Sequence, residues 1–183
     1  PFAIKRTIDF LLAHPDFAPV INPAQIGGVG GSLGGAAFTW LAGAEITCTY
    51  PGLSSRATER DPRVKAVAGY VPYAGQRLLP AFGDENATAT NVSIPFLAMS
   101  GTADTTAPKL LMEQAMNNFR NARFMVALEG VQHTYDIAYA NDVFGWIVPF
   151  LDAYAKGDRA AVDRLSRQRA ITAGLDDHLT IDY

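Results

Sequence analysis

The stretch IGGVGGSLGG at residues 26–35 places six glycines and one serine within ten positions. Its apolar start favours a short buried strand, and the segment LGGAAFTWLAGA (33–44) favours a buried helix. Glycine is needed where the backbone approaches a ligand closely, or where it turns more sharply than a side chain allows. Two interpretations therefore stand open at this point: a turn that binds phosphate and a turn that presents Ser32.

The phosphate interpretation is supported by the fold context, because the first N–H groups of a helix can hold an anion. The full dinucleotide pattern G-x-G-x-x-G fails at Leu33, although a looser pattern with Gly28, Gly30 and Gly34 fits. No acidic residue ends a following strand about 20 residues on, where a ribose partner belongs, and the stretch has no lysine. The alternative of a Rossmann-like nucleotide-binding subunit remains, with weaker support.

The serine interpretation rests on Gly30-Gly31-Ser32-Leu33-Gly34, which has the form G-x-S-x-G between a strand and a helix. That is the context of a nucleophile elbow, a sharp turn that raises the serine hydroxyl above the sheet. We expect the glycines two positions before and after Ser32 to make room, because larger side chains would clash across the turn. A serine hydroxyl is a weak nucleophile and needs a base.

The chain has three histidines from which that base could come. His133 follows the predicted strand RFMVALEG (123–130), at the end of the strand where open α/β sheets build their sites. His14 stands beside Pro15 in an expected surface turn, and His178 falls in a polar C-terminal tail. His133 is therefore the predicted base.

The base needs an acid that holds its tautomer and stabilises its charged form. Asp104 comes shortly after the predicted strand IPFLAMS (94–100), whereas Asp84 and Asp136 follow no predicted strand so directly. A helix cap or a turn is the ordinary alternative role for such an aspartate. The order Ser32, Asp104, His133, each after a strand, matches the order of the triad in α/β-hydrolases.

The rest of the chain predicts a parallel sheet with helices on both faces. Helices are expected at 3–13, 107–120 and 142–168, with breaks in the last at Pro149 and at Gly157-Asp158. Including residues 64–70, four strands alternate with these helices. We expect one α/β domain over residues 1–170 and a C-terminal tail over 171–183.

The composition excludes several classes of function. The formal net charge of −3 gives no electrostatic footprint for nucleic acid. No apolar run approaches the roughly 18 residues of a membrane span. Cys48 is the one cysteine of the 183 residues, so neither an internal disulfide nor a cysteine metal cluster is expected. No cofactor is implied, and the compartment stays open, with a bacterial secreted or periplasmic location as one alternative.

Several segments resemble the C-terminal part of the dienelactone-hydrolase-like branch of the α/β-hydrolases, which includes platelet-activating-factor acetylhydrolase-like and polyester-hydrolase-like enzymes. The resembling segments are GGSLGG, DPRVKAVAGYVPYA, IPFLAMSGTADTTAP, ALEGVQH and PFLDAYAKGD. They span most of residues 20–158. In this branch the residue before the nucleophile is often histidine, and here it is Gly31.

The resemblance implies a serine ester hydrolase with Ser32 as nucleophile, Asp104 as acid and His133 as base. The backbone N–H of Leu33 would be one oxyanion donor. A complete fold of this type has about eight strands, so the resemblance also implies a second chain or an N-terminal fragment that supplies further strands and the second oxyanion donor. The substrate would be a small-molecule, lipid or polyester ester. A peptidase, an acyltransferase and a subunit that keeps the triad without using it remain alternatives.

Overall fold

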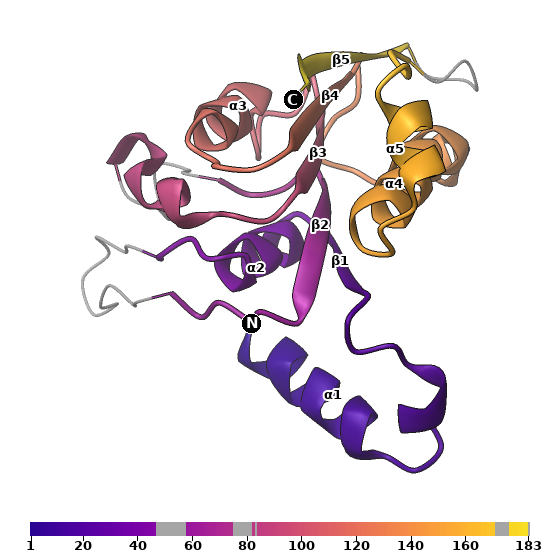
Figure 1. Ribbon diagram of the computed structural model, residues 1–183. Coiled ribbons are helices and arrows are strands. Elements are labelled where there is room, and N and C mark those ends of the chain that lie inside the picture. Colours follow the sequence, from indigo (N-terminus) through magenta and orange to yellow (C-terminus); the bar gives the residue numbers. More distant parts are fainter. Residues whose placement is uncertain (47–57, 75–81, 83, 171–175, 183) are drawn as a thin grey trace.

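The computed structural model describes residues 1–46, 58–74, 82, 84–170 and 176–182, and its centre is a five-stranded sheet in the order β1-β2-β3-β4-β5 (Figure 1). The first four strands are parallel to one another, and β5 is antiparallel to β4. The strands are β1 (Ile26–Gly31), β2 (Val64–Tyr70), β3 (Phe96–Gly101), β4 (Arg123–Leu128) and β5 (Asp177–Asp182). The predicted α/β class with a mostly parallel sheet is confirmed.

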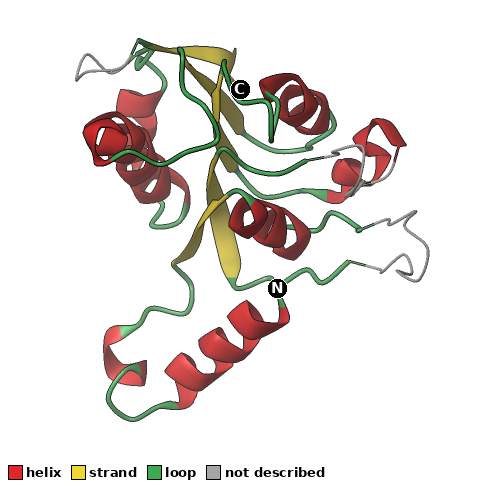
Figure 2. Ribbon diagram, turned by 180° about the vertical axis from the view of Figure 1, so that it is seen from behind, coloured by secondary structure: helices red, strands yellow, loops and turns green. Residues whose placement is uncertain are grey.

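Helices cover both faces of the sheet (Figure 2). One face carries α2 (Leu33–Leu41), which packs on β1 and β2, and α3 (Lys109–Asn117), which packs on β3 and β4. The other face carries α4 (Ala140–Tyr154), which packs on β2 and β3, with α5 (Arg159–Leu165) against it. The remaining elements of the described residues are α1 (Phe2–Ala13) and the 3₁₀ helices η1 (Ala18–Val20), η2 (Asp84–Asn91) and η3 (Ile137–Tyr139).

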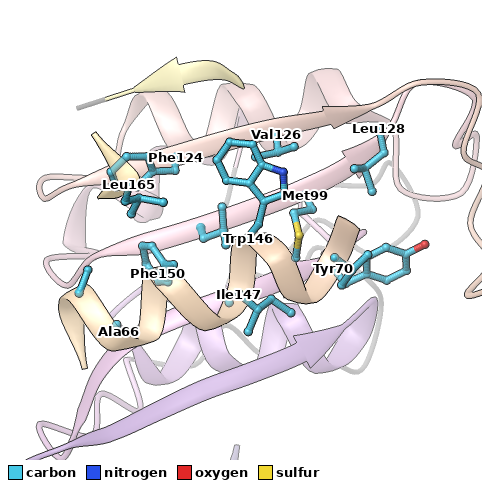
Figure 3. Packing of buried hydrophobic residues seen from close by; sticks show 14 of the residues in the cluster. Ala66, Tyr70, Met99, Phe124, Val126, Leu128, Trp146, Ile147, Phe150 and Leu165 are labelled. Carbon is cyan, nitrogen blue, oxygen red and sulfur yellow. The ribbon is translucent and has the colours of Figure 1, made fainter. Parts of the chain in front are cut away.

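Alternating side chains of the central strands fill two separate cores, one on each face of the sheet. On the α4 face, Leu97 and Met99 of β3 are fully buried in one cluster with Trp146 and Phe150 of α4. Figure 3 shows Met99 beside Trp146. On the opposite face, Phe96 and Ala98 of the same strand are also fully buried. A strand buried on both faces has a continuous apolar sequence, which is why β3 could be predicted from the sequence.

The C-terminal tail expected over 171–183 is wrong for residues 177–182, which form the fifth strand, β5. The segment looks polar, but Leu179 and Ile181 alternate with polar residues and pair with β4. Asp177, which is buried, accepts a hydrogen bond from the indole N–H of the equally buried Trp146. Strand β5 depends on pairing with β4, which is distant in the sequence, and local composition does not reveal such a pairing.

The expected helix break at Pro149 is also wrong, because α4 continues through this residue. A proline inside a helix leaves the carbonyl four residues earlier without its backbone donor. In this chain that carbonyl belongs to Gly145, and it accepts a hydrogen bond from the Gln168 side chain at 3.4 Å. The expected break at Gly157-Asp158 is confirmed, since Gly157 has a φ of +77° and Asp158 caps α5.

Strand β1 lies at one end of the strand order and, within the part of the chain that the structure describes, is hydrogen-bonded to β2 alone. Only Gly28 of its six residues is buried. Cys48 lies outside the described residues, and none of the described helices is long and apolar enough to span a bilayer.

Candidate active site

Ser32 lies at the sharp turn between β1 and α2, with a φ of +51° and a ψ of −120°. A positive φ is strained for any residue that carries a Cβ, and such strain persists only where the surroundings hold it. Here the Ser32 N–H donates to the Tyr70 carbonyl at 3.0 Å, and the Ser32 carbonyl accepts from the Tyr73 N–H at 3.1 Å. The chain just after β2 therefore holds the backbone of Ser32 from both sides.

The glycines around Ser32 do not all serve the role that the sequence pattern predicted. A Cβ on Gly30 would lie 2.5 Å from the Gly34 carbonyl carbon, so Gly30 makes room as expected. A Cβ on Gly34 would meet no atom within 4 Å, so the expected clash at Gly34 is wrong. The tight position after the serine is Gly35, where a Cβ would lie 2.6 Å from the Cβ of Pro72.

Gly28 also has a packing role. A Cβ at this position would lie 2.5 Å from Cδ1 of Phe38, so the missing side chain makes room for an aromatic ring of α2. The space beside Gly28 is thus filled by the protein itself. This bears on the phosphate interpretation, which required the glycine to admit a ligand.

His133 lies in the loop after β4 and links the other two predicted residues by hydrogen bonds. Its Nε2 is 2.8 Å from Ser32 Oγ, and its Nδ1 is 2.7 Å from Asp104 Oδ2. A carboxylate oxygen can only accept, so Nδ1 carries the proton and donates to Asp104, which leaves the Nε2 lone pair facing the serine hydroxyl. A neutral imidazole in this tautomer can accept the serine proton.

Asp104 lies in the loop that follows β3, and its side chain has no exposed area, whereas 21% of the His133 side chain is exposed. Its second oxygen, Oδ1, accepts backbone N–H groups of Thr106 at 2.8 Å and Ala107 at 2.7 Å. The aspartate therefore also has the turn-forming role that was its ordinary alternative. The two backbone donors orient the carboxylate so that Oδ2 points at His133.

Gly101, the last residue of β3, brings the two loops together. A Cβ on Gly101 would lie 2.0 Å from the Val131 carbonyl oxygen, so only glycine fits between β3 and the loop that carries His133. The same carbonyl accepts the Ala103 N–H at 3.1 Å. The sequence analysis assigned no role to Gly101, although it stands between a buried strand and an aspartate.

Leu33 is the first residue of α2, and 62% of its surface is exposed. The first four N–H groups of a helix have no partner within the helix. The backbone N–H of Leu33 is accordingly one of the groups that can donate to an atom placed beside Ser32.

The other weighed residues lie elsewhere. His14 directly follows α1 as its C-cap residue, and its ring packs against Phe10 and Phe17. His178 is on β5, 3.5 Å from a carboxylate oxygen of Glu129. Asp136 caps η3, and Asp84 begins η2.

Tyr70, the last residue of β2, is a further neighbour of the site that the sequence analysis did not single out. Its hydroxyl donates to the Thr134 carbonyl at 2.8 Å, and its ring meets the ring of Tyr135 edge-on at 5.8 Å. Burial raises the pKa of Tyr70 to about 12, with smaller contributions from neighbouring tyrosine and aspartate side chains. The sequence signal that could have indicated Tyr70 is its position at the end of β2, the strand that pairs with β1.

Among the residues that the structure describes, no group of three histidine, cysteine, aspartate or glutamate side chains is placed to hold a metal ion. The arrangement of Ser32, His133 and Asp104 at the carboxyl ends of β1, β4 and β3 is instead suited to nucleophilic chemistry. No protein-family model matches the chain, and a search of curated proteins finds no match either.

Proposed function

We propose that this chain is a serine hydrolase of the α/β-hydrolase type, which cleaves carboxylic esters through an acyl-enzyme. The observation that carries the proposal is the continuous hydrogen-bonded series from Ser32 Oγ through the imidazole of His133 to Asp104 Oδ2. The strained φ of Ser32 supports it, because strain of this kind accumulates at functional sites. The order of the three residues along the chain supports the α/β-hydrolase assignment.

In the proposed reaction, Ser32 Oγ attacks the ester carbonyl carbon while its proton passes to Nε2 of His133. Asp104 stabilises the imidazolium that forms and holds its orientation. His133 then gives the proton to the leaving alcohol as the C–O bond breaks, which leaves the acyl group on Ser32. Water, which gives a proton to His133 as it attacks, then adds to the acyl carbonyl carbon. The bond between this carbon and Ser32 Oγ breaks, the carboxylic acid leaves, and His133 returns the proton to Oγ.

The negative oxygen of each tetrahedral intermediate needs hydrogen-bond donors. The backbone N–H of Leu33, at the first position of α2, is the proposed first donor. The N-terminal end of α2 adds a favourable dipole there, since the helix N-terminus carries partial positive charge.

The Rossmann-like alternative has less support. It assigns Gly28 to close approach of a pyrophosphate, but the Phe38 ring occupies the space beside Gly28. Peptidases and acyltransferases use the same three residues and differ in the acyl acceptor or leaving group. We propose esters because alcohols are better leaving groups than amines, and because of the resemblance described above.

Turnover of a short-chain aryl ester tests the proposal. We expect Ser32→Ala and His133→Ala each to lower kcat by several powers of ten, and the double variant to be little worse than either, because the two residues act as a unit. Ser166→Ala is the matched control, since Ser166 lies after α5 and donates to the Asp163 carbonyl. Near-full activity in Ser32→Ala would contradict the assignment.

We further propose that a second chain or an N-terminal fragment pairs with the edge of β1 that no strand of the described residues covers. The strand has no charged residue and no proline to protect this edge, and Val29 is 46% exposed. Native mass spectrometry of the active material tests this. A fully active, monodisperse species with the mass of this chain alone would contradict it.

A further inference from the structure

Tyr70 joins the two loops that carry the serine and the histidine of the proposed site. Its backbone carbonyl accepts the Ser32 N–H at 3.0 Å, and its side-chain hydroxyl donates to the Thr134 carbonyl at 2.8 Å. Thr134 is the residue directly after His133. One residue of β2 is thus bonded through its backbone to the nucleophile and through its side chain to the neighbour of the base.

From this geometry we infer that Tyr70 is a positioning residue, whose hydroxyl holds the loop of His133 so that Nε2 faces Ser32. The inference rests on the function proposed above only in its consequence for turnover. The contact itself can be tested on the folded protein without any substrate.

The need for such a contact follows from where His133 lies. The imidazole is partly exposed and stands in a loop, whereas Asp104 is buried and bonded to two backbone N–H groups. Asp104 bonds Nδ1, and the ring of Tyr73 meets the imidazole edge-on with the ring centroids 6.4 Å apart, so both contacts act on the ring and neither holds the loop backbone. The Tyr70 hydroxyl restrains the loop backbone from β2, the strand that lies between β1 and β3.

The surroundings of Tyr70 keep its hydroxyl protonated, so the hydroxyl remains a hydrogen-bond donor. The residue is 7% exposed, and its ring packs against Tyr135. Because burial raises the pKa of Tyr70 to about 12, its hydroxyl keeps its proton throughout the range in which a histidine base operates.

The test compares Tyr70→Phe with Tyr135→Phe. The first variant removes the hydroxyl that bonds Thr134, and the second removes a hydroxyl from the ring packed against Tyr70, so each keeps an aromatic ring in place. The first readout is the proton NMR signal of His133 Nδ1–H, shifted downfield by its carboxylate partner and assigned by its loss in His133→Ala. We expect exchange of this proton with water to be about tenfold faster in Tyr70→Phe and unchanged in Tyr135→Phe.

The second readout is ester turnover per active site, counted by complete labelling of Ser32 with a fluorophosphonate. We expect kcat per labelled site to fall about three- to tenfold in Tyr70→Phe with KM unchanged, the size of one hydrogen bond. A loss of folded protein would lower the count of sites and leave kcat per site unaltered.

The two readouts separate the possible failures. If the unmodified chain hydrolyses no ester, the proposed function fails, and the exchange of the His133 proton still decides the role of Tyr70. Equal exchange rates in Tyr70→Phe and the unmodified chain would overturn the inference. Absence of the downfield signal from the unmodified chain would overturn it as well, because the imidazole would then not be held at Asp104.

Discussion

Strands β1 and β3 support opposite ends of the candidate site, and they differ sharply in burial. All six residues of β3 are buried, whereas only Gly28 of β1 is. The position of β3, which leads to Asp104, is set by side chains packed on both faces of the sheet. The position of β1, which leads to Ser32, is set instead by close backbone contacts at glycines and by hydrogen bonds to the end of β2. Side-chain packing therefore positions the acid, and backbone geometry positions the nucleophile.

The comparison predicts that Asp104 cannot be replaced even by a residue of the same shape. In Asp104→Asn the side chain keeps its volume, but an amide can donate to Nδ1 and so favour the wrong tautomer of His133. We expect kcat for an aryl ester to fall by roughly three to four powers of ten, with little loss of stability. Asp163→Asn on the exposed side of α5 is the control, and an equal effect of both variants would contradict the role of Asp104.

Truncation of one apolar side chain in each strand measures the difference in burial directly. Leu97→Ala in β3 opens a cavity in a fully buried position and should lower the free energy of unfolding by about 2 to 5 kcal/mol. Val29→Ala in β1, where the side chain is 46% exposed, should lower it by less than about 1 kcal/mol. Urea unfolding of the two variants measures this, and equal losses would show that β1 is covered in solution.

Alkaline pH tests the burial of β2, the strand between β1 and β3, through the pKa of Tyr70. Its pKa is about 12 in the folded chain and about 10 when unfolded, so the unfolded chain loses this proton first as the pH rises. The stability that Tyr70 contributes is complete below pH 10 and falls by about 2 to 3 kcal/mol between pH 10 and 12. We expect the difference in unfolding free energy between the unmodified chain and Tyr70→Phe to shrink by this amount. A difference that stays constant over the window would show that Tyr70 is not buried.

Two neighbouring glycines test whether backbone contacts set the nucleophile turn. Gly30→Ala forces a Cβ to within 2.5 Å of the Gly34 backbone and should cost about 1 to 3 kcal/mol of stability. Gly34→Ala adds a Cβ to open space in the first turn of α2 and should be neutral or stabilising by up to about 1 kcal/mol. Thermal unfolding distinguishes them, and a larger loss in Gly34→Ala would contradict the account of this turn.

The central strands and the order of the candidate site were predictable from the sequence because their signals are local. Strand β3 is a continuous apolar run, and Ser32, Asp104 and His133 each follow a strand. What the sequence missed depends on contacts between distant segments. Strand β5 is defined by its pairing with β4 and by the bond from Trp146 to Asp177.

The glycine pattern predicted the turn, but it predicted the physical reason for only some of the glycines. The pattern G-x-S-x-G correctly located the turn, and Gly30 makes room as expected. The clash that requires Gly35 arises from Pro72, which lies after a different strand. Likewise, Tyr70 gains its role because β2 ends between the two loops, and no motif marks that position.

Fluorophosphonate labelling tests the central claim, that Ser32 is an activated nucleophile, without requiring the natural substrate. We expect one adduct per chain by intact mass, located on Ser32 by peptide mapping. Labelling should disappear in Ser32→Ala and persist in Ser166→Ala. A folded chain that takes up no label, or takes it up at another residue, would contradict the account.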